Sequence, residues 1–335
     1  MEASWSPDPS DELLHQPWGD ESLPWKDTWY FSLVDADAQV HLAMHMTVTA
    51  GSPSDTRVAV GVRDLAGESV AVRTEPGRTD SSSIGNSLAR LEIVNLSWDS
   101  DHKLRWTADM PWFEFDVTVH GVHFAPLFDT MFPGVNPTGA QGHSYSHTEQ
   151  VITGVGVVKR QNGPEQRISA MGWRDRGWGR RVNELSFGTG YDLIAGILPD
   201  GAAFALSAMR NVEHAPDAPL PIYGFLTDAA GAVPAVGGIF FKDSMSYPAR
   251  LGLEFADGRR VDAEQVAHLS TLSVPFHDAQ PERFGIAVNA RDYYATMADP
   301  GGRSFAVFSN EGHAMRSDVT GQGRFFHTAA PAHNR

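Results

Sequence analysis

A run of charged and aromatic residues between positions 169 and 181 reads SAMGWRDRGWGRR. On an extended strand Arg174 and Arg176 would share one face, and Asp175 would point to the other. A carboxylate with arginines on both sides is expected to pair with a guanidinium, so Asp175 is a better anchor than a proton donor. Two interpretations stay open: a structural knot of Arg–Asp bridges and stacked Trp rings, and a polar cluster that projects into a cavity.

Four polar residues occupy alternate positions at the start of the second half of the chain: His143, Tyr145, His147 and Glu149. On a strand their side chains would all lie on one face. Two imidazoles and a carboxylate could hold a metal ion, or could form an acid–base set with the tyrosine. A solvated surface face is the third interpretation, in which the strand begins only near Thr148.

Tyr191 and Asp192 open a further strand directly after a glycine-rich turn. They are candidates for proton transfer, although Asp192 could equally cap the turn. Of the carboxyl groups in the chain, Asp192 and Glu149 are the preferred proton shuttles. Arg174 or Arg176 would then stabilise developing negative charge or orient the carboxylate.

The hydrophobic pattern that must position these residues has a period of two. Apolar and polar residues alternate from Val40 to Thr49, from Val58 to Arg73 and from Phe113 to His120. Such alternation predicts half-buried strands, with His41 and His45 on an exterior polar face.

Turn signals separate these strands. Asp200-Gly201 and Asp257-Gly258 each lie between two apolar runs and predict hairpins with type I′ turns. Short helical turns are expected only near residues 11–15 and near residues 293–297. Many short strands punctuated by 32 Gly and 21 Pro predict an all-β protein of barrels or sandwiches.

The chain is expected to divide near its middle. Residues 124–142 lack alternation and contain three Pro and three Gly. We therefore predict an N-terminal β-barrel domain over residues 1–130 and a C-terminal β-barrel domain over residues 131–328 that carries the arginine-rich motif. Seven of the nine Trp lie in the first 112 residues, where they could pack a core or line a ligand cavity.

Composition excludes several classes of function. The 335-residue chain has a formal net charge of −15, which disfavours nucleic acid as a partner, and it contains no Cys. The N-terminus does not resemble a signal peptide and no apolar run is long enough to span a membrane, so a cytoplasmic protein is expected. Phosphate-binding, dinucleotide, zinc-protease and serine-hydrolase motifs are absent, so no cofactor is predicted. A homodimer is left open.

The stretch MGWRDRGWGRR (171–181) resembles the G-x-RD-x-SWG-x-R signature of a bacterial family of two-part β proteins. That family is distantly related to the hydroxyneurosporene synthase (carotenoid 1,2-hydratase) and AttH-like group. The segments at 24–37 and 143–158 extend the resemblance over most of the chain. Gly177 stands where the family usually has Ser, so any role of that hydroxyl is absent here.

The resemblance implies two lipocalin-like β-barrel or half-barrel domains and a hydrophobic ligand. Characterised relatives in the wider group add water to isoprenoid double bonds or cyclise terpenoid-like substrates without redox cofactors. Trp173, Trp178, Asp175 and Tyr145 are accordingly candidate substrate-binding residues.

Two functions remain to be distinguished. The first is a cofactor-independent acid–base enzyme (a lyase, hydratase, isomerase or cyclase) acting on a hydrophobic or aromatic small molecule such as an isoprenoid. The second is a non-catalytic carrier of a hydrophobic ligand, in which the arginine-rich motif is structural. The cavity could lie in either barrel or at the interface between the two halves.

Overall fold

The computed structural model describes most of the chain between Leu14 and Arg316. The described residues are 14–15, 17, 25–49, 56–65, 69–77, 87–90, 94–98, 103–131, 144–180, 190–210, 222–242, 248–276 and 286–316. None of the helices in these segments has the length and apolar character needed to cross a lipid bilayer.

The first of two β-sheets is open and has ten strands in the order β4-β3-β2-β1-β10-β9-β8-β7-β6-β5. These strands are β1 (Trp25–Asp35), β2 (Val40–Thr49), β3 (Thr56–Asp64), β4 (Ser69–Gly77), β5 (Ser87–Arg90), β6 (Val94–Trp98), β7 (Leu104–Met110), β8 (Phe113–Gly121), β9 (Ser144–Arg160) and β10 (Glu165–Arg180). The only described helix is the short α1 (Phe128–Met131), between β8 and β9. The sheet curls around a core to which both of its arms contribute, with Phe31 and Met44 from one side and Trp106 and Phe115 from the other. It is therefore a half-barrel with its own apolar interior.

The second sheet is a closed barrel of eight strands in sequence order. Its strands are β11 (Gly190–Ile197), β12 (Ala203–Arg210), β13 (Ile222–Asp228), β14 (Gly231–Lys242), β15 (Pro248–Phe255), β16 (Arg260–Phe276), β17 (Ile286–Ala298) and β18 (Ser304–Arg316). Pairing of β11 with β18 closes it. A second apolar cluster, with Phe204, Leu226 and Phe255 among its members, packs the described part of its interior. The all-β prediction, with a half-barrel and a barrel packed together, is confirmed.

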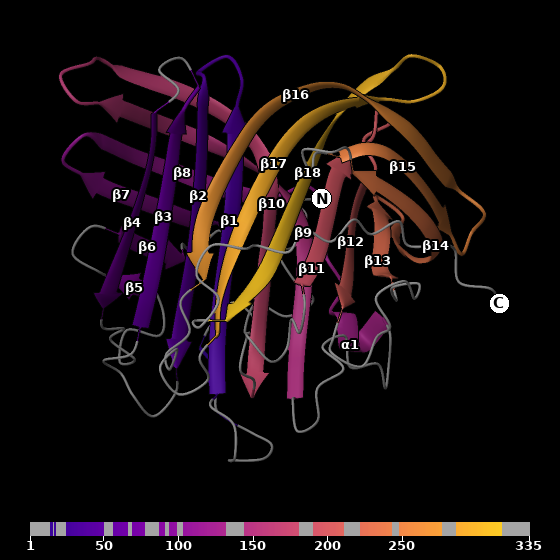
Figure 1. Cartoon of the computed structure of the whole chain (residues 1–335), viewed down its shortest axis with the longest axis horizontal. Helices are drawn as coiled ribbons and strands as arrows, with labels where there is room; N and C mark the ends of the chain where they lie inside the picture. Colours follow the sequence, from indigo (N-terminus) through magenta and orange to yellow (C-terminus); the bar gives the residue numbers. More distant parts are fainter. Residues whose placement is uncertain are drawn as a thin grey trace.

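The outer face of the half-barrel packs against the outer face of the barrel. Tyr30 and Trp173 from the sheet lie in one buried cluster with Leu193, Phe225 and Phe308 from the barrel. Strand β16 also crosses β2 and β3, as the arch of β16 over the indigo strands shows (Figure 1). The sheets thus enclose an extended buried interface.

This interface corrects the prediction that His41 and His45 are exterior. Every residue of β1 and of β2 is buried, because one face of these strands covers the half-barrel core and the other covers the barrel. His41 is 0% exposed and its Nδ1 lies 2.8 Å from Ser270 Oγ on β16. Alternation in β2 correctly predicted the strand, but its polar face meets another sheet instead of water.

Both Asp-Gly hairpins are confirmed, but their turn type was wrong. Gly201 and Gly258 have positive φ angles of 89° and 87°, and no positive φ is found at Asp200 or Asp257. In each loop the glycine N–H donates to the carbonyl three residues earlier, as Gly201 does to Leu198. These are three-residue loops that end in a left-handed glycine.

The predicted helical turn at residues 293–297 was also wrong, since the segment lies in β17. Tyr293, Ala295 and Met297 are each at most 1% exposed and alternate with partly exposed residues. The period of two was therefore present in the sequence there as well. Most of the other expected turn, near residues 11–15, lies outside the residues that the structure describes.

Sheet membership differs from the division expected at residue 130. Strands β9 and β10 lie between β8 and β1 in the half-barrel, so the change of sheet falls at residues 181–189. The Pro- and Gly-rich segment near residue 130 connects β8 to its antiparallel neighbour β9, which is a connection within one sheet. The arginine-rich motif therefore belongs to the half-barrel. Whether the two sheets are separate folding domains stays a prediction.

Close packing of β10 against β1 requires a glycine at position 172 of the motif. A Cβ at this position would lie 1.7 Å from the Ser32 carbonyl oxygen on β1. We expect Gly172→Ala to lower the free energy of unfolding by about 1–3 kcal/mol, because β1 and β10 must move apart to accept the methyl group. Urea denaturation followed by Trp fluorescence measures this loss. Gly252→Ala is the control, since its nearest neighbour would be Asp262 Oδ1 at 3.3 Å; an equal loss in both variants would contradict the steric explanation.

Candidate active site

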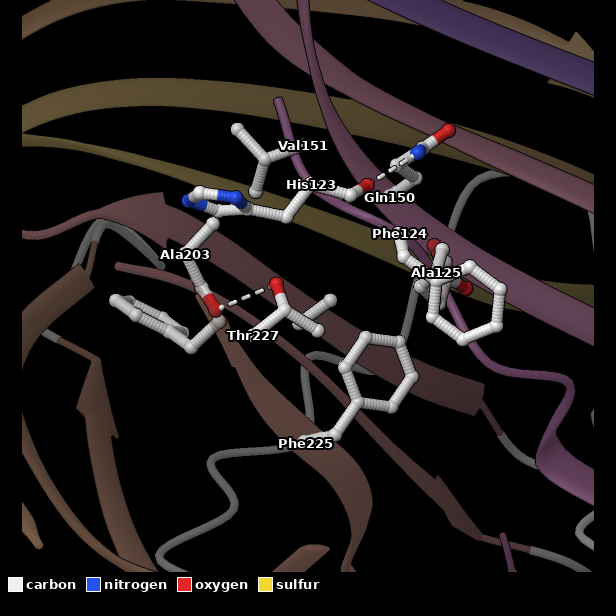
Figure 2. A pocket seen from close by; sticks show the side chains of 11 residues that line it. His123, Phe124, Ala125, Gln150, Val151, Ala203, Phe225 and Thr227 are labelled. Carbon is white, nitrogen blue, oxygen red and sulfur yellow. Dashed lines mark hydrogen bonds between the residues drawn. The ribbon is translucent and has the colours of Figure 1, made fainter. Parts of the chain in front are cut away.

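A pocket with an empty volume of about 190 Å³ lies at the interface between the sheets, beside the end of β8. Apolar side chains supply most of its wall: Phe124, Ala125, Val151, Ala203, Ala205 and Phe225. Figure 2 shows that these residues come from the chain after β8, from β9 and from the barrel strands β12 and β13. Glu149, Gln150 and Thr227 are among the polar lining residues.

Glu149 is positioned by β9 and faces the barrel together with His147 and, on the neighbouring strand, Asp175. Glu149 and Asp175 are direct cross-strand partners, and His147 precedes Glu149 by two residues on the same face. His147 Nε2 lies 2.8 Å from Glu149 Oε1 and 3.2 Å from Asp175 Oδ2. Side-chain exposure is 1% for His147 and 2% for Glu149, whereas Asp175 is 23% exposed. One ring nitrogen thus serves two carboxyl groups.

The charges of this cluster are set by burial and by each other. Burial raises the pKa of Glu149 to about 8; the His147 charge opposes this rise and the Asp175 carboxylate adds to it. Burial alone would lower the pKa of His147, but the negative charge of Asp175, and that of Glu149 when it is ionised, raise it to about 10. At neutral pH the cluster therefore contains an imidazolium, a carboxylate and a neutral Glu149 carboxylic acid.

The metal interpretation of this set is less favourable. Its three ligand atoms lie within 4.8 Å of one another, which a divalent cation could bridge. A metal ion, however, would have to displace the proton that the two carboxyl groups favour on the His147 imidazole. We therefore interpret His147, Glu149 and Asp175 as an acid–base set. His143, the other residue of the metal hypothesis, lies outside the described residues.

The two neighbours of Glu149 should shift its titration in opposite directions. His147→Gln removes the positive charge and should raise the Glu149 pKa above about 8, while Asp175→Asn should lower it. Infrared titration of the buried carboxyl group measures both shifts. Shifts of the same sign in the two variants would contradict the assigned charges.

Arg174 lies behind the pocket wall. It is fully buried, and its Nε donates to Gln150 Oε1 at 2.7 Å. Gln150 in turn donates to the His123 carbonyl oxygen at 2.6 Å, a bond drawn in Figure 2. Arg174 also opposes the rise in the Glu149 pKa through its charge. The structure thus places this predicted residue near the acid as support for a lining side chain.

Arg176 lies on the same face of β10 as Arg174, inside the half-barrel and opposite to the face of Asp175. Its guanidinium donates to Asp27 Oδ1 at 2.7 Å and stacks over the Trp29 ring at 4.0 Å. The expectation that Asp175 anchors a flanking arginine is therefore wrong for Arg176, because neighbouring residues on a strand point to opposite faces. The structural-knot interpretation fits Arg176, which is not near the pocket.

The two tryptophans of the motif separate in the same way. Trp178 shares the inner face with Arg176 and stacks on His15 at 4.1 Å. Trp173 faces the barrel and stacks on Tyr30 at 5.1 Å. Only Trp173 is thus placed in the interface that contains the pocket.

The remaining predicted site residues are Asp192, Tyr145 and Tyr191. Asp192 is partly buried and has the parity of Ile194, which packs inside the barrel, so it lies off the face that meets the half-barrel. Tyr145 and Tyr191 lie in β9 and β11, but their side chains are outside the described part of the structure. The structure therefore brings Glu149, His147 and Asp175 together and leaves Asp192 apart from them.

A second buried polar cluster was missed by the sequence interpretation. Tyr30 Oη on β1 donates to Asp292 Oδ2 on β17 at 2.5 Å. Asn310 Nδ2 on β18 donates to Asp292 Oδ1 at 2.6 Å and lies 3.4 Å from Tyr30 Oη. Each of these residues is at most 2% exposed. The only available signal was the parity of Asp292 within a strand that was interpreted as helical.

Comparisons with known proteins agree with this architecture. A family model described as a domain of unknown function, DUF7064, matches residues 8–279. No curated protein matches the chain. An AttH-like protein from Nitrosomonas europaea superposes with a TM-score of 0.59 at 16% identity, over 92% of this chain and 98% of that one.

Two further solved structures are similar. Kievitone hydratase from Nectria haematococca has a TM-score of 0.54 at 11% identity, over 95% of this chain and 98% of its own. CghA has a TM-score of 0.53 at 12% identity, over 96% and 98% of the two chains. At these identities the likeness establishes the fold, which is the one expected from the resemblance to the AttH-like and hydratase group.

Proposed function

The chain belongs to the DUF7064 family, and from that premise we propose that it is a cofactor-independent acid–base enzyme of the hydratase type. Its substrate would be an apolar small molecule with a carbon–carbon double bond, or the corresponding alcohol in the reverse direction. One observation carries the proposal: Glu149, a buried carboxyl group with its pKa raised to about 8, lines a pocket most of whose lining residues are apolar. A neutral carboxylic acid in such a wall is suited to protonate an alkene.

The proposed reaction begins with transfer of the Glu149 proton to one alkene carbon, which leaves positive charge on the adjacent carbon. The new Glu149 carboxylate is stabilised by the His147 imidazolium, whose Nε2 lies 2.8 Å away. The carboxylate of Asp175 offsets the positive charge on the substrate. Water then bonds to the cationic carbon and loses one proton, which gives the alcohol.

The size and lining of the pocket restrict what can bind. The empty volume of about 190 Å³ includes space that is open to solvent, so the pocket as it stands can enclose only a small group, such as one end of a longer molecule. The walls contributed by Phe124, Val151 and Phe225 favour an aryl or branched alkyl group. An alkene end such as that of an isoprenoid group meets both requirements.

Two independent lines support this function over a carrier. The structural neighbours include a protein whose name states hydration of kievitone, and the arginine-rich motif resembles a family related to a carotenoid hydratase. Apolar side chains fill the described interior of the barrel, where a lipocalin-type carrier would hold its ligand. The ionisable cluster lies instead at the interface.

The test is incubation of the purified full-length protein with a panel of aryl and isoprenoid alkenes that includes kievitone, in heavy-oxygen water. Mass spectrometry should detect one labelled water added to at least one compound, and the addition should require Glu149. If no alkene gains labelled water, and none of the corresponding alcohols loses water, the proposed function is wrong.

A further inference from the structure

Hydration requires a group that receives a proton from the attacking water, and the second buried cluster has the chemistry for this step. Asp292 accepts hydrogen bonds from Tyr30 at 2.5 Å and from Asn310 at 2.6 Å. Tyr30 comes from the half-barrel, whereas Asp292 and Asn310 come from adjacent barrel strands. A phenol that donates to a buried carboxylate can pass on a proton that it receives.

The amide oxygen of Asn310 adds an independent observation. The residue is 1% exposed, and its Oδ1 has no hydrogen-bond partner among the described residues. A buried acceptor without a partner is destabilising, and a water molecule would supply the missing donor. Because the amide nitrogen of Asn310 lies 3.4 Å from Tyr30 Oη, such a water would also be close to the phenol.

This cluster lies in the same row of the sheet as the proposed acid. Glu149 pairs with Asp175, and Asp175 pairs with Tyr30, so the three residues cross β9, β10 and β1 on one face. Neighbouring strands are about 5 Å apart. Asp175 keeps 23% of its side-chain surface exposed between Glu149 and Tyr30, which are each 2% exposed. Solvent-accessible surface on Asp175 therefore lies between the two clusters.

We propose that Tyr30, Asp292 and Asn310 form the water-activating half of the site, which rests on the hydratase function proposed above. Asn310 Oδ1 and Tyr30 Oη hold the attacking water. As the water oxygen bonds to the cationic carbon, one of its protons moves to Tyr30 Oη and the original Tyr30 proton moves to Asp292 Oδ2. Glu149 has lost one proton and Asp292 has gained one, and exchange with solvent restores both. Tyr30 is the catalytic residue of this half, and Asp292 acts through it.

The titration of Asp292 is consistent with this step. Burial raises the pKa of Asp292 to about 6, although hydrogen bonds from Tyr30, Asn310 and Ser32 favour the ionised form. At neutral pH Asp292 is thus mostly ionised and can accept a proton while Glu149 remains protonated. Activity should therefore fall below about pH 6, where Asp292 is protonated, and above about pH 8, where Glu149 ionises.

The other titratable groups around Asp292 do not account for the acid limb of this profile. His41 Nε2 is 4.0 Å from Asp292 Oδ2. Burial, together with the charges of Arg63 and His268, lowers the pKa of His41 to about 3. His41 is thus neutral throughout the range in which Asp292 titrates.

The experiment compares wild type, Tyr30→Phe and Asp292→Asn as full-length proteins, with the panel compound that wild type hydrates, on both sides of neutral pH. We expect kcat to fall about 100-fold or more in each variant with little change in KM. The acid limb near pH 6 should also disappear in Asp292→Asn. A merely structural role would change stability without removing that limb. Tyr30→Phe deletes only a hydroxyl, so it keeps the test available if Asp292→Asn does not fold.

Tyr294→Phe, on the same face of β17 as Asp292, is the matched control and should retain the wild-type rate and both limbs. The inference is overturned if Tyr30→Phe retains the wild-type kcat and acid limb while Glu149→Gln is inactive. In that case the hydratase proposal still stands. Failure of wild type to hydrate any panel compound would instead overturn the function itself.

Discussion

Replacing Glu149 by Gln should reduce turnover by about 100- to 10,000-fold and leave the protein folded. The amide has nearly the same shape as the neutral carboxylic acid, so the pocket wall is preserved while the transferable proton is lost. The limb of the rate profile near pH 8 should vanish as well, because that limb arises from ionisation of Glu149. Steady-state kinetics with the panel compound that wild type hydrates measures both effects.

Glu114→Gln is the matched control for this variant. Glu114 lies on β8 at the exposed surface, where its carboxylate accepts from Lys159 Nζ at 3.2 Å. The same chemical change there should leave kcat and the alkaline limb unchanged. Wild-type turnover in Glu149→Gln would show that Glu149 is not the proton donor of the reaction.

The second large effect is expected on stability. Asp27→Asn leaves the fully buried Arg176 guanidinium without its carboxylate partner, and we expect the free energy of unfolding to fall by about 3–5 kcal/mol. Burial alone would raise the pKa of Asp27, but Arg176 and His15 hold it below the ordinary value. The ionised form therefore stabilises the fold above about pH 4, and wild type loses this contribution as the pH falls further. Urea denaturation at several pH values measures the loss.

An exposed ion pair offers the control. Asp116 pairs with Arg105 on the surface of β7 and β8, where the two side chains are 39% and 56% exposed. Asp116→Asn should cost only about 0–1 kcal/mol, because water already solvates both groups. Equal losses in Asp27→Asn and Asp116→Asn would show that burial of Arg176 is not the source of the effect.

The sequence predicted those features that depend on local pattern. Alternation identified β2 and β8, and the Asp-Gly pairs located two barrel hairpins. The Asp-Gly pairs did not predict the type of turn correctly, although Pro199 before Asp200 indicates a type I turn. Proline fixes φ near −65°, which suits a type I turn followed by a left-handed Gly201.

Sheet membership required information that alternation does not contain. The segment near residue 130 has the composition of a linker, yet β8 and β9 on either side of it pair with each other. The polar face of β2 carries the same pattern whether water or another sheet covers it. His41 was thus placed at the surface, although Ser270, 229 positions later, covers it.

The candidate site was predictable only within one strand. His147 and Glu149 were grouped because residues two apart share a face. Their proximity to Asp175 depends on the register of β9 against β10, which no local pattern specifies. Tyr30 and Asp292 are 262 positions apart, and only the packing of the barrel on the half-barrel brings them together.

The central claim is that Glu149 is a neutral carboxylic acid at neutral pH, and infrared difference spectroscopy between wild type and Glu149→Gln tests it most directly. We expect a protonated-carboxyl C=O band in wild type that is absent from the variant and disappears as the pH rises through about 8. A difference spectrum that contains only carboxylate bands at neutral pH would contradict it.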